Sequence, residues 1–263
     1  MKSLNEEKRL IQLLQGSKVF FEGELVEILF AGKPIYHSGE GKTDFYILLS
    51  NGKEIKVSSK SKTADFIENK INAPRAEQIF GKDWSKIISS SAKAIEEEFY
   101  KKQLYYPEKQ GSRISAGSYT MGWRLDIINK NSGKLVCPII LSKEQKAEIF
   151  LGTNLSIEKR DVMVNGSIVK NAGIANRILI DSENYSSAQE IIDGLIKIED
   201  YQSDYFLAFK AVNYRSLEDK IDGNRPLAIW IDWRKEKPEI VFDTPFKYGA
   251  KNDVLKWFKE AKR

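Results

Sequence analysis

The chain has 263 residues, 41% of them hydrophobic and 30% charged, and it lacks any run of about 18 apolar residues, which argues against a membrane-spanning helix and indicates a globular protein. Forty-two basic and 37 acidic residues give a formal net charge of +5, which favours a polyanionic partner such as nucleic acid. The single cysteine and single histidine exclude an internal disulfide and leave no ligand set for a structural zinc ion.

The first part of the chain is predicted to form two helices. Residues 1–14 carry apolar positions near one face among charged ones. Those charges occupy the place where a signal peptide has its apolar stretch, so we expect no cleaved leader and a cytoplasmic protein. Residues 18–31 place Phe21, Leu25 and Ile28 at helical spacing, which predicts the second helix, although Val19 and Phe20 fit a strand equally well.

A β-hairpin is predicted next, over residues 44–60. An Asn-Gly pair at 51–52 separates two apolar-rich runs, and both residues tolerate the positive φ angles of a two-residue type I′ turn. In the register of such a turn, Asp44 lies opposite Ser59 and close to the residues on either side of it. Because both faces of the hairpin carry apolar side chains, we expect it to lie inside a sheet.

The remaining elements follow from hydrophobic periodicity and from turn residues. Residues 105–117 are predicted to form a loop. No internal repeat and no change of composition marks a domain boundary, so one α/β domain is the simplest interpretation. Helices are expected at 64–71, 83–104, 187–199 and 252–262, and strands at 118–129, 134–141, 162–170, 176–181, 205–213, 227–233 and 238–243.

The residues Gly41-Lys42-Thr43-Asp44, followed by a hairpin that ends Val57-Ser58-Ser59-Lys60, resemble the core of the PD-(D/E)XK nuclease superfamily, which includes many restriction endonucleases. In that family the first Asp and the acid two positions before the Lys hold a divalent metal beside the scissile phosphate, and the Lys orients or activates the attacking water. Hydrolysis of a phosphodiester requires neutralisation of the negative charge on the phosphoryl oxygens, which the metal and the lysine provide. Hard oxygen ligands suit magnesium. The resemblance implies that Asp44 is a metal ligand and that the cofactor is magnesium (Mg2+).

Two alignments are open for the second half of the motif. Glu54 and Lys56 give the literal acid-x-Lys pattern, but a tight turn places Glu54 roughly 17 Å along the strand from Asp44 at 3.4 Å per residue. Ser58 and Lys60 lie at the right height, with serine in place of the acid. We favour Asp44, Ser58 and Lys60 as the catalytic residues over Asp44, Glu54 and Lys56. A wider or bulged loop would reverse this preference.

Further metal ligands are implied by the same resemblance. A backbone carbonyl contributes in the family, and Ser59 matches that position. An acid from a preceding helix also often contributes. Glu24 and Glu27, on the helix predicted at 18–31, are the candidates for this role.

Cationic residues near the motif are the candidates for nucleic-acid binding. Lys62 belongs to a run of hydroxyl and cationic side chains, and Lys62 and Arg75 would neutralise phosphates. Residues 105–124 mix aromatic, glycine, hydroxyl and arginine residues, a composition typical of a loop that enters a groove or stacks on bases. Arg113 and Arg124 are therefore candidates too, and ordinary solvated charge is the competing interpretation.

Together these patterns predict an α/β fold with a mixed β-sheet flanked by helices, a restriction-endonuclease-like core with β-rich additions. We expect one domain over 1–263, with the core motif at 20–61 and a DNA-contacting or accessory part at 105–263. The expected function is a magnesium-dependent endonuclease of restriction or phage type that hydrolyses DNA phosphodiester bonds, as a homodimer if it cuts symmetric duplex sites. The alternative is a noncatalytic nucleic-acid-binding protein on the same fold.

Overall fold

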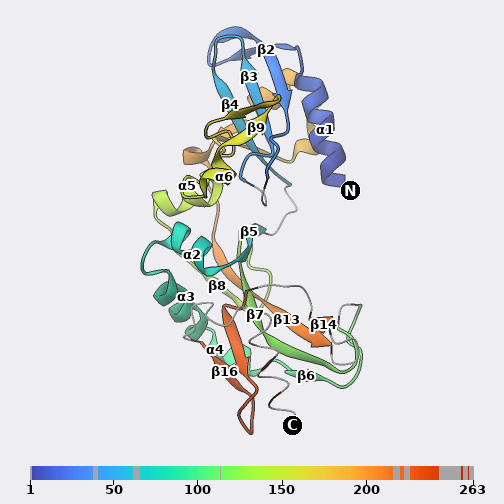
Figure 1. Ribbon diagram of the computed structural model, residues 1–263, viewed down its shortest axis with the longest axis vertical. Helices are drawn as coiled ribbons and strands as arrows, with labels where there is room; N and C mark the ends of the chain where they lie inside the picture. Colours follow the sequence, from blue (N-terminus) through green and yellow to red (C-terminus); the bar gives the residue numbers. More distant parts are fainter. Residues whose placement is uncertain are drawn as a thin grey trace. The chain divides into compact units, whose positions relative to one another are not determined.

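A computed structural model describes most of the chain, which divides into two compact units (Figure 1). The first unit comprises Met1–Ala64 and Ser142–Gln202, and the second comprises Asp65–Leu141 and Ser203–Arg263. The expected class, α/β with a mixed sheet flanked by helices, is confirmed, whereas the single domain over 1–263 stays a prediction. The described residues are 2–37, 41–61, 66–112, 114–215, 220–221, 226–242, 256 and 260.

The first unit is built on a six-stranded mixed sheet in the order β1-β2-β3-β4-β11-β12. Neighbouring strands are antiparallel except β4 and β11, which are parallel. The hairpin β3–β4 therefore lies inside the sheet, as its apolar faces predict. The strands are β1 (Lys18–Phe21), β2 (Glu24–Gly32), β3 (Phe45–Leu49), β4 (Glu54–Lys60), β11 (Arg177–Ile180) and β12 (Leu195–Lys197).

Both faces of the β3–β4 hairpin are covered. On one face, Phe45 and Val57 join a buried cluster with Leu10 and Leu14 of α1 (Lys2–Leu14) and with residues of α7 (Ala188–Asp193). On the other face, Tyr46 packs against a small hairpin of β9 (Val162–Val164) and β10 (Ser167–Val169). The remaining helices of this unit are α5 (Lys143–Leu151), α6 (Ile157–Arg160) and the short 3-10 helices η1 (Ser182–Asn184) and η2 (Ile198–Asp200).

The helix predicted at 18–31 is wrong, because this segment forms the antiparallel hairpin β1–β2. Glu22 and Gly23 make a two-residue turn with φ angles of 51° and 88°, the positive values of a type I′ turn. Along the strands burial alternates: Val19 and Phe21 are buried in β1, while Val26 and Ile28 are buried in β2. The two-residue turn shifts the buried positions from odd to even numbers, so the combined pattern imitates helical spacing.

The loop between β3 and β4 is wider than predicted. The N–H of Leu49 donates to the carbonyl of Lys53, so the loop holds the three residues 50–52, and Gly52 has a φ of 79°. Three-residue hairpin loops commonly end with a glycine in this left-handed conformation. The paired residues run from Leu48 opposite Glu54 to Phe45 opposite Val57, one residue away from the register that would place Asp44 opposite Ser59.

The second unit is built on an eight-stranded sheet with β7 and β13 at its centre. Its helices are α2 (Ala73–Phe80), α3 (Trp84–Lys93) and α4 (Glu96–Tyr100). The ring of Phe99 contacts the rings of Trp123 and Phe209 edge to face, with distances between ring centroids of 4.9 and 5.4 Å. Its strands are β5 (Phe66–Ile71), β6 (Tyr105–Tyr106), β7 (Ser118–Ile128), β8 (Val136–Pro138), β13 (Phe206–Arg215), β14 (Lys220–Ile221), β15 (Ile229–Asp232) and β16 (Glu239–Val241).

Most strands predicted outside the motif are confirmed with shifted ends, whereas several helices are not. The segment 64–71 contains strand β5 instead of a helix, because it pairs with β7. The helix predicted at 83–104 is divided into α3 and α4, and that at 187–199 ends at Asp193 before β12. Helix α2 was missed, although Asn72 caps it and a proline stands in its first turn. Apart from residues 256 and 260, the helix predicted at 252–262 lies outside the described residues.

Candidate active site at the β3–β4 hairpin

Asp44 stands immediately before β3, at the end of the hairpin away from the loop. Its main-chain N–H donates to the carbonyl of Val57, the residue that pairs with Phe45, at 2.8 Å. Its Oδ2 accepts from the main-chain N–H of Ser59 at 2.6 Å, and the Ser58 hydroxyl lies 3.5 Å from the same atom. The carboxylate of Asp44 is thereby fixed against the last residues of β4, close to Lys60.

Opposing influences act on the ionisation of Asp44. Burial is the largest and raises the pKa of the carboxyl above its usual range, because the charged form loses hydration. The positive charge of Lys60 and the N–H of Ser59 act in the opposite direction and stabilise the carboxylate. The net effect raises the pKa of Asp44. A carboxylate that is costly to keep ionised in the free protein is a group that gains from a bound cation.

The first helix brings a second carboxylate, that of Glu7, within electrostatic range of Asp44. Glu7 lies three and seven residues before Leu10 and Leu14, which are both fully buried, so the three side chains share one face of α1. The charge of Glu7 contributes to raising the pKa of Asp44, and the charge of Lys33 contributes to lowering it. Lys33 follows β2, and its Nζ lies 2.6 Å from the Glu7 carboxylate. Asp44, Glu7, Lys33 and Lys60 therefore form one cluster of charges.

The direction of the main-chain carbonyls in β4 supports the position predicted for Ser59. The carbonyls of Lys56 and Lys60 accept from Asn176 and Asp181, on the side of β11. Carbonyls alternate in direction along a strand, so those of Val57 and Ser59 point to the other side. The Val57 carbonyl does so, because it accepts from the N–H of Asp44. The Ser59 carbonyl is thus directed past the beginning of β3, toward the side on which Asp44 lies.

The structure separates the two alternatives for the second half of the motif. Glu54 pairs with Leu48, four residues along β3 from Asp44, or about 14 Å at 3.4 Å per residue. Its carboxylate lies 3.7 Å from Nζ of Lys56 and contributes to raising the pKa of buried Tyr46. Glu54 and Lys56 therefore form a local pair near the loop. The wider loop does not reverse the preference for the serine alignment, because it shifts the register by a single residue.

Glu24 and Glu27 are placed on β2 and not on a helix. Glu24 accepts from the side chain of Asn51 at 3.1 Å, and the main chain of Glu27 is bonded to Ser50. Both glutamates thus lie near the loop, and Ser50 is six residues along the chain from Asp44, about 20 Å in an extended strand. The structure does not bring these two side chains to Asp44. Glu7 was missed because the acid was sought on the helix predicted at 18–31, which is a strand pair, and not on the helix at the start of the chain.

The residues predicted to bind nucleic acid are distributed differently. Lys62 and Arg113 lie outside the described residues. Arg75 is buried in α2, and its guanidinium lies 3.2 Å from the Glu68 carboxylate. Arg124 is on β7, not in a loop, and forms an ion pair with fully buried Asp126. Both described arginines therefore have carboxylate partners inside the second unit.

The side chains at the hairpin end fit the ligand chemistry of magnesium. Magnesium is bound in proteins through one or two carboxylates and keeps several waters or substrate oxygens. Asp44 and Glu7, whose charges interact, would supply two carboxylates, and Ser59 would supply a carbonyl oxygen. In the described part of the chain no group of three or more His, Cys, Asp or Glu side chains is arranged to hold a metal. Two carboxylates and one carbonyl oxygen would leave positions on the ion for waters and substrate oxygens.

Comparisons with known protein families, with curated proteins and with solved structures found no match for this chain. Among the helices of the described residues, none combines the length and the apolar character needed to cross a membrane.

Proposed function

We propose that the first unit is a magnesium-dependent endonuclease that hydrolyses DNA phosphodiester bonds. The observation that carries the proposal is the cluster at the end of the β3–β4 hairpin. There Asp44 lies against residues 58–59, and the charges of Lys60 and Glu7 act on its carboxyl. These residues are far apart in the sequence, and a partly buried carboxylate with a raised pKa beside a lysine is a feature of functional sites.

Each residue of the cluster has a proposed role. Asp44 and Glu7, with the Ser59 carbonyl, would hold the metal. When bound, magnesium supplies charge neutralisation on the phosphoryl oxygens and lowers the pKa of a bound water. Lys60 would place its ammonium beside the scissile phosphate, where it stabilises the developing negative charge and orients the attacking water. Ser58 would keep the Asp44 carboxylate oriented through its hydroxyl.

DNA is the proposed partner, and the chain's net charge of +5 favours a polyanion. Cleavage of both strands at a symmetric site would require two active sites, which a homodimer with twofold symmetry supplies.

A second candidate is a noncatalytic nucleic-acid-binding protein with the same fold, and two observations favour it. Serine stands where the family has an acid, which removes one charged ligand. In addition, the Glu7 carboxylate is held by Lys33 at 2.6 Å, so a metal ion would have to compete with this ion pair. A metal site with fewer carboxylates binds its ion less tightly.

Plasmid and linear DNA incubated with the protein, with and without magnesium, separate the two candidates. For the endonuclease we expect cleavage that requires magnesium and is lost in Asp44→Ala, while this variant still binds DNA. Glu24→Gln is a matched control, because it removes a carboxylate from the same unit at the other end of the hairpin, and it should cut normally. Equal cleavage by Asp44→Ala and the wild type would refute the proposed site, and DNA binding without any cleavage would favour the second candidate.

A further inference from the structure

Lys33 interacts with both of the carboxylates that are proposed to hold the metal. Its Nζ lies 2.6 Å from the Glu7 carboxylate, and its charge also acts on Asp44. Lys60 acts on Asp44 as well, so the cluster holds two negative and two positive charges and is balanced without a metal. A divalent ion that enters this cluster is therefore repelled by a lysine that is already bound to one of its ligands.

The main chain at Lys33 is fixed on both sides. Gly32, at the end of β2, is paired with β3. Buried Pro34 restricts the residue before it to an extended conformation. The main chain of Ile35 is bonded to that of Met163 in both directions, at 2.9 and 3.3 Å. A change in the position of the Lys33 ammonium therefore involves its side chain and not the backbone.

The two side chains of this ion pair differ in exposure. That of Lys33 is 47% exposed, whereas that of Glu7 is 14% exposed. A lysine ammonium is strongly hydrated and stands on a flexible four-carbon stem, so it can leave the carboxylate for water. The Glu7 carboxylate has little contact with water and is stable in its charged form only beside a cation. The pair therefore has one partner that can move and one that always needs a counter-charge.

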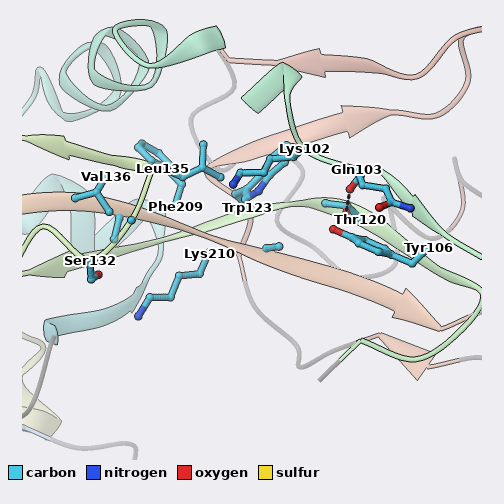
Figure 2. A pocket seen from close by; sticks show the side chains of 13 residues that line it. Lys102, Gln103, Tyr106, Thr120, Trp123, Ser132, Leu135, Val136, Phe209 and Lys210 are labelled. Atoms are coloured by element: carbon cyan, nitrogen blue, oxygen red, sulfur yellow. Dashed lines mark hydrogen bonds between the residues drawn. The ribbon is translucent and has the colours of Figure 1, made fainter. Parts of the chain in front are cut away.

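A lysine–carboxylate pair of the second unit has a different character. Lys210, which lines a cavity in that unit (Figure 2), places its Nζ 3.2 Å from the carboxylate of Asp126. Asp126 is fully buried and is also bound by Arg124 and by the main-chain N–H of Lys70. A buried carboxylate that is surrounded by protein donors in this way is a structural group. The lysine of the pair in the first unit instead interacts with a second carboxylate, that of the proposed metal site.

We infer that Lys33 is the exchangeable counter-ion of the metal site. Lys33 neutralises Glu7 in the metal-free protein, and it releases Glu7 and turns to water when magnesium binds. Lys33 thereby stabilises the metal-free site and raises the magnesium concentration that is needed to fill it. The inference rests on the proposed function, in that it takes Asp44 and Glu7 as the metal ligands.

Calorimetric titration of the full chain with magnesium chloride tests this exchange. Removing one unit charge close to a divalent ion changes its affinity by about tenfold, so Lys33→Met should bind magnesium about tenfold more tightly than wild type. Lys53→Met is the matched control. It removes the same charge from an ion pair of 2.8 Å with Glu22, in which the lysine is 46% exposed, and it lies beside the loop at the other end of the hairpin. Its magnesium affinity should stay within about twofold of wild type.

Thermal unfolding separates a counter-ion from a lysine with a structural role alone. Without metal, Lys33→Met should unfold about 2 to 4 °C below wild type, because Glu7 has lost its counter-charge. Saturating magnesium should remove this difference, whereas the loss of a structural ion pair would leave it unchanged. If Lys33→Met does not fold, Lys33→Gln keeps a hydrogen-bond donor for Glu7 and should show the same gain in magnesium affinity.

The inference is overturned if the magnesium affinity of Lys33→Met is unchanged or weaker, or if Lys53→Met shows an equal gain. It is also overturned if none of these proteins binds magnesium in a saturable way. Neither measurement requires cleavage, so failure of the proposed endonuclease and failure of this inference give different results. A gain in affinity in a protein that does not cut DNA supports the exchange and refutes the endonuclease, whereas cleavage without any gain in Lys33→Met refutes the exchange alone.

Discussion

The two lysines on the same face of β4 give the most direct test of the active site. Lys60 and Lys56 are four residues apart, about 14 Å along the strand, and only Lys60 lies at the end that holds Asp44. Replacing either lysine with alanine removes one charge from the same strand. The structure predicts that only the Lys60→Ala variant loses cleavage.

The expected sizes of the two effects differ widely. A group that assists proton transfer and charge neutralisation contributes about 10²-fold to 10⁴-fold in rate, so Lys60→Ala should cost about 2.7 to 5.4 kcal/mol in the barrier at 1.36 kcal/mol per factor of ten. Lys56 interacts with a partly exposed Glu54 at 3.7 Å, and such pairs stabilise the fold by at most about 1 kcal/mol. Lys56→Ala should therefore cut DNA within about twofold of the wild-type rate.

Initial rates of plasmid nicking at saturating magnesium measure both effects. Thermal unfolding of the two variants, followed by circular dichroism, shows whether each is folded. If Lys56→Ala loses as much activity as Lys60→Ala while both are folded, the serine alignment is wrong and the Glu54 alignment must be reconsidered.

Three further outcomes are expected. Ser58→Asp places a second carboxylate beside Asp44 and should lower the magnesium concentration for half-maximal cleavage about tenfold. Without metal the two like charges repel, so the unfolding temperature should fall. An unchanged magnesium dependence would contradict this. Because the pKa of Asp44 is raised in the folded protein, its negative charge lowers the free energy of unfolding once the pH rises through that pKa. Asp44→Asn should therefore stabilise the metal-free protein at neutral pH, and it should not do so at a pH below the usual pKa range of aspartate. Urea unfolding at both pH values measures this difference, and equal effects at both would count against it. Gly122→Ala would place a Cβ 2.3 Å from the Ile229 carbonyl oxygen and should lower the unfolding free energy by at least about 2 kcal/mol, whereas Gly133→Ala, which meets nothing within 4 Å, should change it little. Similar urea midpoints for these two glycine variants would refute that reasoning.

The sequence was informative where a local signal was strong. The Asn-Gly pair after β3 predicted a hairpin, and the apolar residues on both faces of the flanking runs predicted a strand pair covered on both faces, because turn preference and hydrophobic pattern are local properties. The approach of Asp44 to the last residues of β4 followed from that hairpin. The exact register did not follow, since a loop of two or three residues fits the same signal.

Local periodicity failed where two strands imitated a helix. In residues 18–31 the apolar positions satisfied helical spacing, but a two-residue turn at Glu22 divided the segment into β1 and β2. The choice between these structures is made by burial, since Val19 and Val26 are paired across the hairpin and both lie in the core. Burial depends on the rest of the fold, which a short window of sequence does not contain.

The sequence by itself determined the class of fold, the hairpin and the approach of Asp44 to the end of β4 that carries Lys60. Only the tertiary structure decided which other charges join them. Glu7 reaches the site because α1 packs its leucines against the sheet, and β4 acquires its parallel neighbour β11 from more than a hundred residues further along the chain. Such contacts depend on how apolar faces are buried against one another, a property of the whole unit that no local pattern encodes.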